Sequence, residues 1–567
     1  MNIISNSARR ASTAAASPPR RRALRVGAVV LAGTLFLSAC SGGTDTDTAA
    51  TETQDSLVVA VPALAPTLDG AVGGGGTTLE SFEMNANLQA GLVRNPYIDG
   101  QTENTVVQDF NEYVPYLAED YSVSEDGLVY TFTLRDDLLS QVGNPITADD
   151  VLWSFERKWA SPLYSKTVWQ GGFTDPASSL AKIDDHTVAF TLTNPGFGVT
   201  FLGLLANIQG HIYDSTLMKE NATAADPYAL EWAKTNSGWG LGPYSVESQV
   251  PDQEMILAAN PNYVFGEPAM KTVTLRVVGD AGTRASLVAT GDVDMAEGVR
   301  PADQAKLAGT EGIVVPEADP IEYVDLTLVT NKAPFDNELV RQAMAYAIPY
   351  DDIITQIYSD RAVRTTGNIN TNTAGYSVDD LPTYDYDPEK AKDLLAEAGF
   401  ADGLDFSLSV SSANQDLVDA SVLIQSFAQD AGFDVTIDQQ TAQAFGQGRT
   451  EATFQAILYR NRAQVQTPTY ASTLFFKPGN DSSNPSRWED EASAEYWSVV
   501  NEALAIADPL SDEAGEKWIE AQTILLEATP EIFIASIQPS QVFTSDIAGF
   551  AYRSENAIDF GNITIAE

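Results

Sequence analysis

Residues 130–134 read YTFTL, and residues 147–155 read TADDVLWSF. The first stretch alternates apolar and hydroxyl side chains, which is the pattern of a half-buried β-strand. The second predicts a helix that begins at Thr147, because this hydroxyl can cap the first turn and because Asp149 and Asp150 suit the positive end of the helix dipole. A strand followed by a capped helix is typical of folds that mix sheets and helices.

The same alternation of elements continues along the chain. Residues 56–64 (SLVVAVPAL) predict a buried strand, and residues 187–192 (TVAFTL) predict a second half-buried strand. Helices are predicted over 338–346 and 388–398, the latter capped by Asp387. This order predicts an α/β protein with mixed sheets and argues against a repeat array or an all-helical bundle.

The composition excludes several functions. With 567 residues the chain is long enough for two or three domains, and its formal charge of −46 disfavours a nucleic-acid partner. Two histidines and one cysteine leave no cluster with metal-ligand spacing, so neither a metal nor another cofactor is expected. No P-loop, HExxH or GxSxG motif occurs in the chain, and we expect a protein that is not an enzyme.

The N-terminal residues have the pattern of an export signal. Residues 1–39 contain six arginines and no acid, and the apolar stretch 26–37 is too short to span a bilayer. Residues 37–40, LSAC, resemble a bacterial lipobox, which predicts lipidation of Cys40 at the outer face of the cell membrane; the alternative is a buried free cysteine. Residues 40–55 then read as anchor and flexible tether, and either the Sec or the Tat route fits the arginines.

Several segments, taken in order, resemble one protein family. The family is the extracellular solute-binding proteins of family 5, the peptide and nickel binders of ABC importers. The resemblance is carried by YVPYLAEDYSVSEDGLVYTFTLRDD and PITADDVLWSFER within 113–157, IDDHTVAFTL (183–192), GWGLGPYSV (238–246), NPNYVFGEP (260–268), PFDNELVRQAMAYAI (334–348) and YDYDPEKAKDLLAEAGF (384–400). Tyr121 replaces the family's usual tryptophan.

The resemblance implies a two-lobed periplasmic-binding-protein type II fold with one inserted domain. Lobe I is expected to consist of three separate segments, 56–100, 236–322 and 535–567. The inserted domain is expected over 101–235 and lobe II over 323–534. The chain crosses between lobes near 322 and 535, and these crossings are expected to be hinges. A monomer is expected that delivers its solute to an ABC permease and ATPase complex.

The candidate ligand residues come from a window without acids. Residues 452–480 contain no Asp or Glu. Alignment with the family's peptide binders matches Arg449, and it places Asn461 at a usual tryptophan and Gln464 at the aspartate that pairs with a ligand's ammonium group in those relatives. Further candidates are the aromatic residues Tyr459 and Trp239 and the guanidinium groups of Arg460 and Arg462.

Alternatives remain open for these residues and for the function. Arg460 and Arg462 share a face if they lie on a strand, and that face could instead meet acidic groups of the other lobe. Trp239 could pack in a core. The family's base rate favours an oligopeptide as solute, whereas the loss of the aspartate favours a carbohydrate or an anionic conjugate. Alternatives from other classes are an extracytoplasmic hydrolase and an adhesion or structural lipoprotein.

Overall fold

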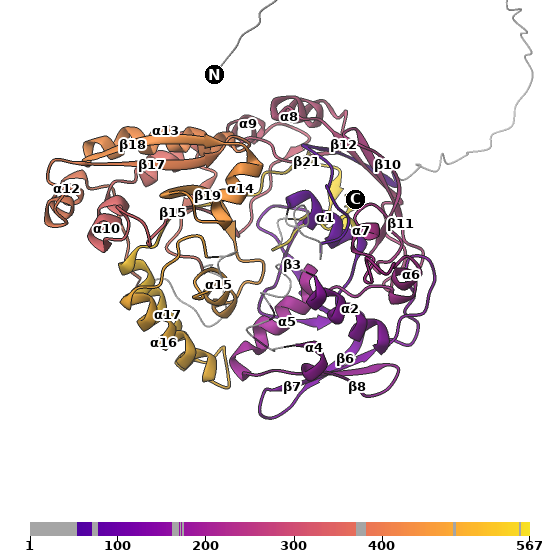
Figure 1. Cartoon of the computed structure of the whole chain (residues 1–567). Helices are drawn as coiled ribbons and strands as arrows, with labels where there is room; N and C mark the ends of the chain where they lie inside the picture. Colours follow the sequence, from indigo (N-terminus) through magenta and orange to yellow (C-terminus); the bar gives the residue numbers. More distant parts are fainter. Residues whose placement is uncertain are drawn as a thin grey trace, which may run out of the picture. The chain divides into compact units, whose positions relative to one another are not determined.

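The computed structural model describes residues 54–70, 78–161, 169, 172, 175–369, 381–479, 484–554 and 557–566 (Figure 1). The predicted leader, Cys40 and all but the last two residues of the tether lie outside these ranges. Within them, the helices are too short or too polar to cross a membrane.

The first lobe is built on a mixed sheet of seven strands. Its order is β10 (Tyr244–Val250), β11 (Glu254–Ala259), β12 (Thr272–Val277), β1 (Ser56–Val61), β13 (Met295–Ala296), β21 (Val542–Thr544) and β14 (Ile313–Val314). β1 runs parallel to β12 and β13, whereas β11 runs antiparallel to both of its neighbours, β10 and β12. The predicted strand near residue 56 is therefore confirmed, and its central position agrees with its apolar, Val-rich sequence.

A four-stranded antiparallel sheet follows β1 in the chain. Its order is β6 (Ala118–Val123), β7 (Val129–Leu134), β9 (Thr187–Thr191) and β8 (Leu180–Lys182). The helix predicted from Thr147 is α2 (Ala148–Ala160), and Thr147 and Asp150 form a reciprocal capping box at its start. Residues 130–134 and 147–155 thus form the strand and the helix expected of them.

The second lobe is built on a mixed sheet of six strands. Its order is β16 (Ala362–Arg364), β20 (Glu531–Ile537), β15 (Glu322–Leu328), β19 (Ala456–Arg462), β17 (Leu404–Ser411) and β18 (Phe433–Gln440). α13 (Gln415–Asp430) packs along β17 and β18, and the predicted helices α10 (Glu338–Tyr346) and α12 (Pro388–Glu397) pack against each other (Figure 1). Asp387 caps α12, as predicted.

Two segments connect the seven-stranded and six-stranded sheets. One leads from β14 into β15, and the other leads from β20 into β21. The two are tied together, because the Ala318 amide donates to Gln538 Oε1 at 3.0 Å. Gln304 Nε2 donates to the Pro539 carbonyl at 2.8 Å. The crossings predicted near 322 and 535 fall at the first residue of β15 and inside β20.

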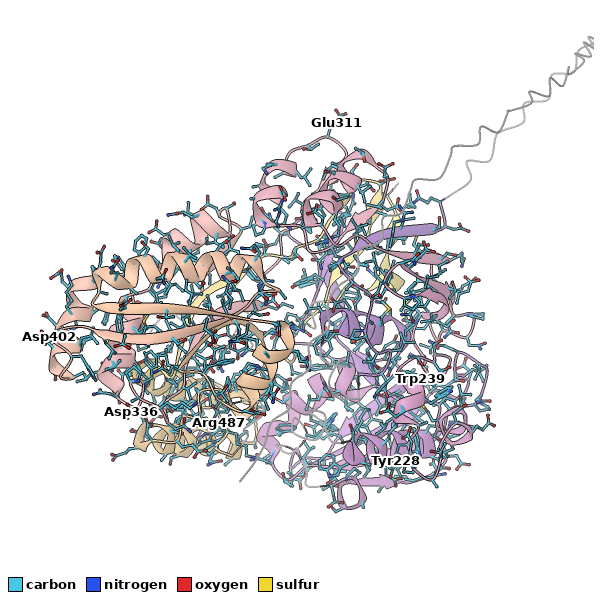
Figure 2. All side chains as sticks on the ribbon, turned by 45° about the horizontal axis from the view of Figure 1, so that its top comes forward. Tyr228, Trp239, Glu311, Asp336, Asp402 and Arg487 are labelled. Atoms are coloured by element: carbon cyan, nitrogen blue, oxygen red, sulfur yellow. The ribbon has the colours of Figure 1, made fainter. Side chains whose placement is uncertain are left out.

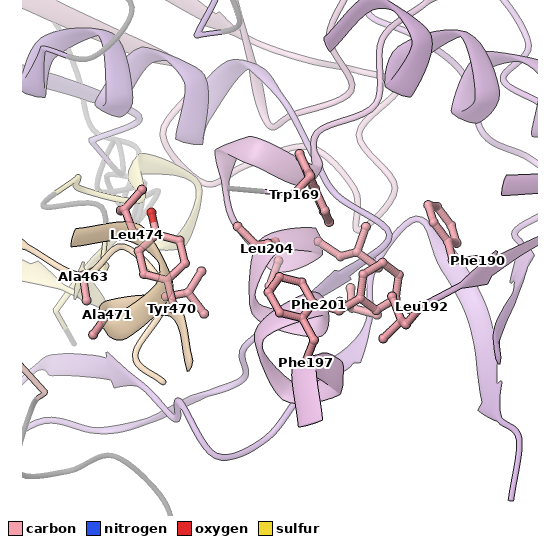
Figure 3. Packing of buried hydrophobic residues seen from close by; sticks show 14 of the residues in the cluster. Trp169, Phe190, Leu192, Phe197, Phe201, Leu204, Ala463, Tyr470, Ala471 and Leu474 are labelled. Carbon is pink, nitrogen blue, oxygen red and sulfur yellow. The ribbon is translucent and has the colours of Figure 1, made fainter. Parts of the chain in front are cut away.

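One hydrophobic cluster is shared between the four-stranded sheet, its covering helix α5 (Gly198–Ala206), and the helices α15 (Pro468–Phe475), α16 (Glu491–Ala505) and α17 (Asp512–Ala528). Figure 3 shows its two sides. Phe201 and Leu204 of α5 lie beside Trp169, and Tyr470 and Leu474 of α15 lie opposite. These helices therefore form much of the contact between the two lobes.

Candidate functional site

Strand β19 carries most of the predicted ligand residues. Ala456 and Leu458 face the core of the second lobe, and Arg460 and Arg462 follow on the same face because strand side chains alternate. Tyr459 and Asn461 point to the opposite face. The prediction that the two arginines share one face of a strand is confirmed.

Arg460 is neutralised by two acids of the six-stranded sheet and its helix. Its guanidinium bonds to the Asp416 carboxylate of α13 and lies 3.7 Å from Glu322 Oε2 of β15. Tyr358 Oη also donates to Asp416, at 2.8 Å. Burial acts to raise the pKa of Asp416, but the charge of Arg460 and these hydrogen bonds outweigh it and hold the pKa below its ordinary value.

Arg462 shares the second of these acids. Its Nη1 lies 3.4 Å from Glu322 Oε1, and its guanidinium lies over the Phe82 ring of α1 (Leu79–Leu88) at 5.0 Å. Two arginines and two carboxylates therefore form one charge-balanced group. Asp416 lies in α13 and Glu322 in β15, so the acids come from elements of the six-stranded sheet's own lobe, and the alternative of acids from the other lobe is wrong. The arginines are therefore less available to an anionic solute than the sequence indicated.

Arg449 and Tyr459 belong to a different cluster. The Arg449 guanidinium lies 5.3 Å from the Tyr459 ring, beside the carboxylates of Asp325 and Glu531 on the neighbouring strands. Burial raises the pKa of Asp325 to about 8, and burial together with the charge of Asp325 raises that of Glu531. Tyr459 is buried in this cluster and Arg449 is half-buried, and their role in ligand binding stays a prediction.

Asn461 and Gln464 mark the end of β19 and the turn that follows it. Asn461 Nδ2 donates to Tyr459 Oη at 2.9 Å. Gln464 is 5% exposed, and its carbonyl accepts a hydrogen bond of 3.0 Å from Asn207 Nδ2. The Gln464 side chain has only a long contact, 3.5 Å from its Oε1 to Tyr470 Oη.

A small cavity lies beside Gln464. Its volume is about 10 Å³, which is room for about one water molecule, and it is bordered by segments that are far apart in the chain. Its lining residues are Asn95, Gln108, Phe110, Tyr113, Gly203, Ala206, Asn207, Gln464, Val465, Gln466 and Ser554. The cavity therefore lies where the N-terminal region, helix α5, the turn after β19 and the C-terminal region meet.

Contacts between α5 and the turn after β19 hold the two sides of this cavity together. Thr200 Oγ1 and Thr467 Oγ1 lie 2.5 Å apart and are hydrogen-bonded, and Asn207 bonds to the Gln464 carbonyl. A Cβ atom on Gly203 would lie 2.3 Å from Val465 Cγ1, so only glycine permits this approach. The described form of the protein is therefore one in which the two sides are closed on each other.

Trp239 lies away from this cavity. It is 1% exposed, stacks on Tyr213 at 5.2 Å between ring centroids, and donates from Nε1 to the Asn236 carbonyl at 2.6 Å. It belongs to the core of the first lobe (Figure 2). Its contacts are those of a packing residue, and its stacking on a ligand stays an untested prediction.

The absence of acids from 452–480 has a structural reason. Most residues from Ala456 to Phe476 are buried against α5, the sheet or the helices of the second lobe. A carboxylate added here would be buried without a spare cation, because Arg460 and Arg462 are already paired. The window is therefore a packed contact region.

Sequence reasoning missed the cavity residues outside this window. Asn95, Gln108, Tyr113 and Asn207 are neutral residues in four separate places of the sequence, and none belongs to a motif that indicates a site. Only their arrangement in space distinguishes them. In the described residues, no group of three or more His, Cys, Asp or Glu side chains could hold a metal ion.

Comparison with known families gives one clear match. The family described as bacterial extracellular solute-binding proteins, family 5 Middle, matches residues 112–483. Among curated proteins, the chain is 29% identical to heme-binding protein A of Haemophilus influenzae over 67% of this chain and 70% of that protein. It is 27% identical to the dipeptide-binding protein of Escherichia coli over 80% of this chain and 86% of that protein.

Solved structures agree with these sequence matches. The periplasmic binding protein DppA of Helicobacter pylori, in complex with the peptide STSA, is 25% identical and superposes with a TM-score of 0.77 over 91% of this chain and 99% of that one. A dipeptide-binding protein of Pseudoalteromonas in complex with Met-Leu superposes with a TM-score of 0.76 at 22% identity, over 90% of this chain and all of that one. The predicted two-lobed fold is confirmed.

Proposed function

Because the chain belongs to the bacterial extracellular solute-binding proteins of family 5, we propose that it captures a solute for an ABC importer by closing its two lobes around it. The observation that carries this proposal is the two-lobed fold, in which two segments connect the seven-stranded and six-stranded sheets. A solute held between the lobes touches both of them only when they are closed. Binding therefore shifts the equilibrium toward the closed form, which the permease would recognise.

The proposal includes a membrane anchor and a class of solute. Lipidation of Cys40 would hold the protein at the outer face of the cell membrane, with residues 40–55 as tether. Relatives named for dipeptide, glutathione and heme binding support a small organic solute, and a peptide is favoured by the number of peptide binders among them. The pairing of Arg460 and Arg462 with Asp416 and Glu322 removes most of the support for an anionic conjugate.

The experiment that tests the proposal has two steps. Native mass spectrometry of the purified chain identifies any solute that copurifies, and a thermal-shift panel of di- to pentapeptides and oligosaccharides then finds others. Small-angle scattering with the best solute is expected to show a smaller radius of gyration than without it. A radius that no copurified or added solute changes would contradict capture by closure. Incubation with membranes labelled by an alkyne fatty acid tests the anchor, with Cys40→Ala as control.

A further inference from the structure

A cavity inside the second lobe is large enough for a small molecule. Its volume is about 280 Å³, close to the lower limit for ligand pockets, whereas the void beside Gln464 holds about one water molecule. It is bordered by α10, by α11 (Tyr350–Asp352), by the C-terminal end of α17 and by residues 364–366, 382–385 and 531–533. The whole lining therefore comes from one lobe, which separates this cavity from a site between the lobes.

The end of strand β16 leaves room at this edge of the six-stranded sheet. β16 pairs with β20 over residues 535–537. Among the described strands, residues 531–533 of β20 pair with β15 alone, and all three border the cavity. The cavity is thus a consequence of how the sheet ends.

Two buried polar side chains of the lining have no hydrogen-bond partner among the described residues. Glu531 is 1% exposed, and both of its carboxylate oxygens are unpaired. Thr529 is 2% exposed, and its Oγ1 is also unpaired. A buried polar atom without a partner costs free energy, and a buried carboxylate costs more than a hydroxyl. Such atoms in the lining of a cavity indicate a place for a polar ligand.

The groups around Glu531 leave one negative charge to be balanced. The charged groups that act on it are the Asp325 carboxylate and the Arg449 guanidinium, so two acids share one cation. Its charge also acts on three tyrosines, Tyr323, Tyr459 and Tyr496. Burial and the charge of Asp325 raise the pKa of Glu531, so the protein without a ligand holds a proton there. A bound cation could take the place of that proton.

The remaining charges near the cavity do not oppose a cation. Arg364 is the basic residue of the lining, and its Nη1 lies 3.6 Å from Asp385 Oδ1 and 3.8 Å from Asp351 Oδ1. Two further acids, Glu338 and Glu527, act on Tyr384 of the lining. The acids around the cavity therefore outnumber the two arginines.

The aromatic residues of the lining also suit a cation. They are Tyr350, Tyr384 and Phe533. The Arg364 guanidinium lies 3.8 Å from the centroid of the Tyr350 ring, so one cation already stacks on this wall. Ring faces attract cations, and they also pack against the carbon part of a ligand.

We propose that the second lobe contains a separate site for a small organic cation, in which an ammonium group pairs with the Glu531 carboxylate and donates to Thr529 Oγ1. The carbon part of this cation packs on Tyr384 and Phe533. The inference goes beyond the proposed function and does not depend on it, because the site lies within one lobe.

Matched probes of nearly equal size test the inference. The first pair is benzylamine and benzyl alcohol, and the second is isopentylamine and isopentanol; the members of a pair differ mainly in charge. Ligand-observed NMR titration of the purified chain is expected to show at least about tenfold tighter binding of the amine in at least one pair. The affinity for that amine should rise from about pH 6 to about pH 8, since Glu531 releases its proton when the cation binds, whereas the affinity for the alcohol should not change.

Two variants and a control locate the binding. Glu531→Gln keeps the size of the side chain and removes its charge, so it is expected to weaken the amine at least about tenfold and to change the alcohol less than about threefold. Glu495→Gln removes an exposed charge of α16 and should leave both affinities unchanged. Thr383 is an exposed residue of the lining, so Thr383→Trp should block the cavity without disturbing the core; this variant tests the site if Glu531→Gln does not fold.

Three results would overturn the inference. One is a wild-type protein that binds both alcohols as tightly as the amines. The second is no binding of either amine. The third is amine binding that neither Glu531→Gln nor Thr383→Trp weakens, because the amine would then bind elsewhere. Compaction with a copurified solute tests the proposed function separately, and none of these three results affects it.

Discussion

Replacing Gly203 by alanine should weaken closure of the two lobes and leave the folding of each lobe intact. Gly203 lies in α5, and an added Cβ would lie 2.3 Å from Val465 Cγ1 and 3.0 Å from Tyr113 Oη. Carbon atoms pack best at about 3.5–4.0 Å, so the two sides of the cavity would have to separate by more than about 1 Å or distort. Overpacking of this kind costs about 1–3 kcal/mol.

This cost falls on the closed form. When the two sides are apart, alanine in the helix is not disfavoured and adds up to about 1 kcal/mol of helix stability. The variant is therefore expected to bind the best solute of the thermal-shift panel about 5- to 150-fold more weakly, while its unfolding free energy without solute stays within about 1 kcal/mol of the wild type. Calorimetry gives the affinity and urea unfolding gives the stability.

Two further variants control this experiment. Gly446→Ala also adds a methyl group to a helix glycine, in α14 (Ala442–Thr450), but nothing lies within 4 Å of its Cβ, so affinity should not change. Val465→Ala combined with Gly203→Ala removes the clashing methyl group and should restore much of the affinity. A Gly203→Ala protein that binds like the wild type would refute the reasoning, because the approach of α5 to Val465 would then not limit closure.

Three other predictions concern the charged clusters and Trp239. Burial raises the pKa of Asp325 to about 8, so the folded chain holds a proton that the unfolded chain releases near pH 3.8. The free energy of unfolding should therefore fall as pH rises from about 4 to about 8 and level off above pH 8. Asp325→Asn should reduce this fall by up to about 1.4 kcal/mol per pH unit, measured by urea unfolding. Arg460→Met should lower stability by about 3 kcal/mol, since it leaves the partly buried Asp416 carboxylate without a cation and leaves Glu322 with Arg462 alone. Lys517→Met, at an exposed ion pair, should cost less than about 1 kcal/mol, and equal costs would contradict the network. Trp239→Phe should lower the free energy of unfolding by about 1–3 kcal/mol, measured by thermal unfolding, but change solute affinity less than about threefold. A larger change in affinity would indicate that Trp239 contacts the solute.

The sequence predicts the local parts of this fold well. The capping residues Thr147 and Asp387 act within one helical turn, so their neighbours in sequence determine what they do. The alternation in 130–134 likewise needs no distant partner to make one face of a strand apolar. The order of the family motifs predicts the two-lobed architecture, and the likeness to solved structures confirms that architecture.

Local sequence patterns could not predict the surroundings of the site residues. Arg460 is bonded to Asp416, 44 positions away, and Asn207 is bonded to Gln464, 257 positions away. No local pattern encodes such pairings, because they depend on how β19 lies against α13 and on how α5 meets the following turn. Neutral residues such as Asn207 carry no sequence signal of their own. The sequence therefore predicted arginines as site residues, whereas amide side chains line the cavity beside Gln464.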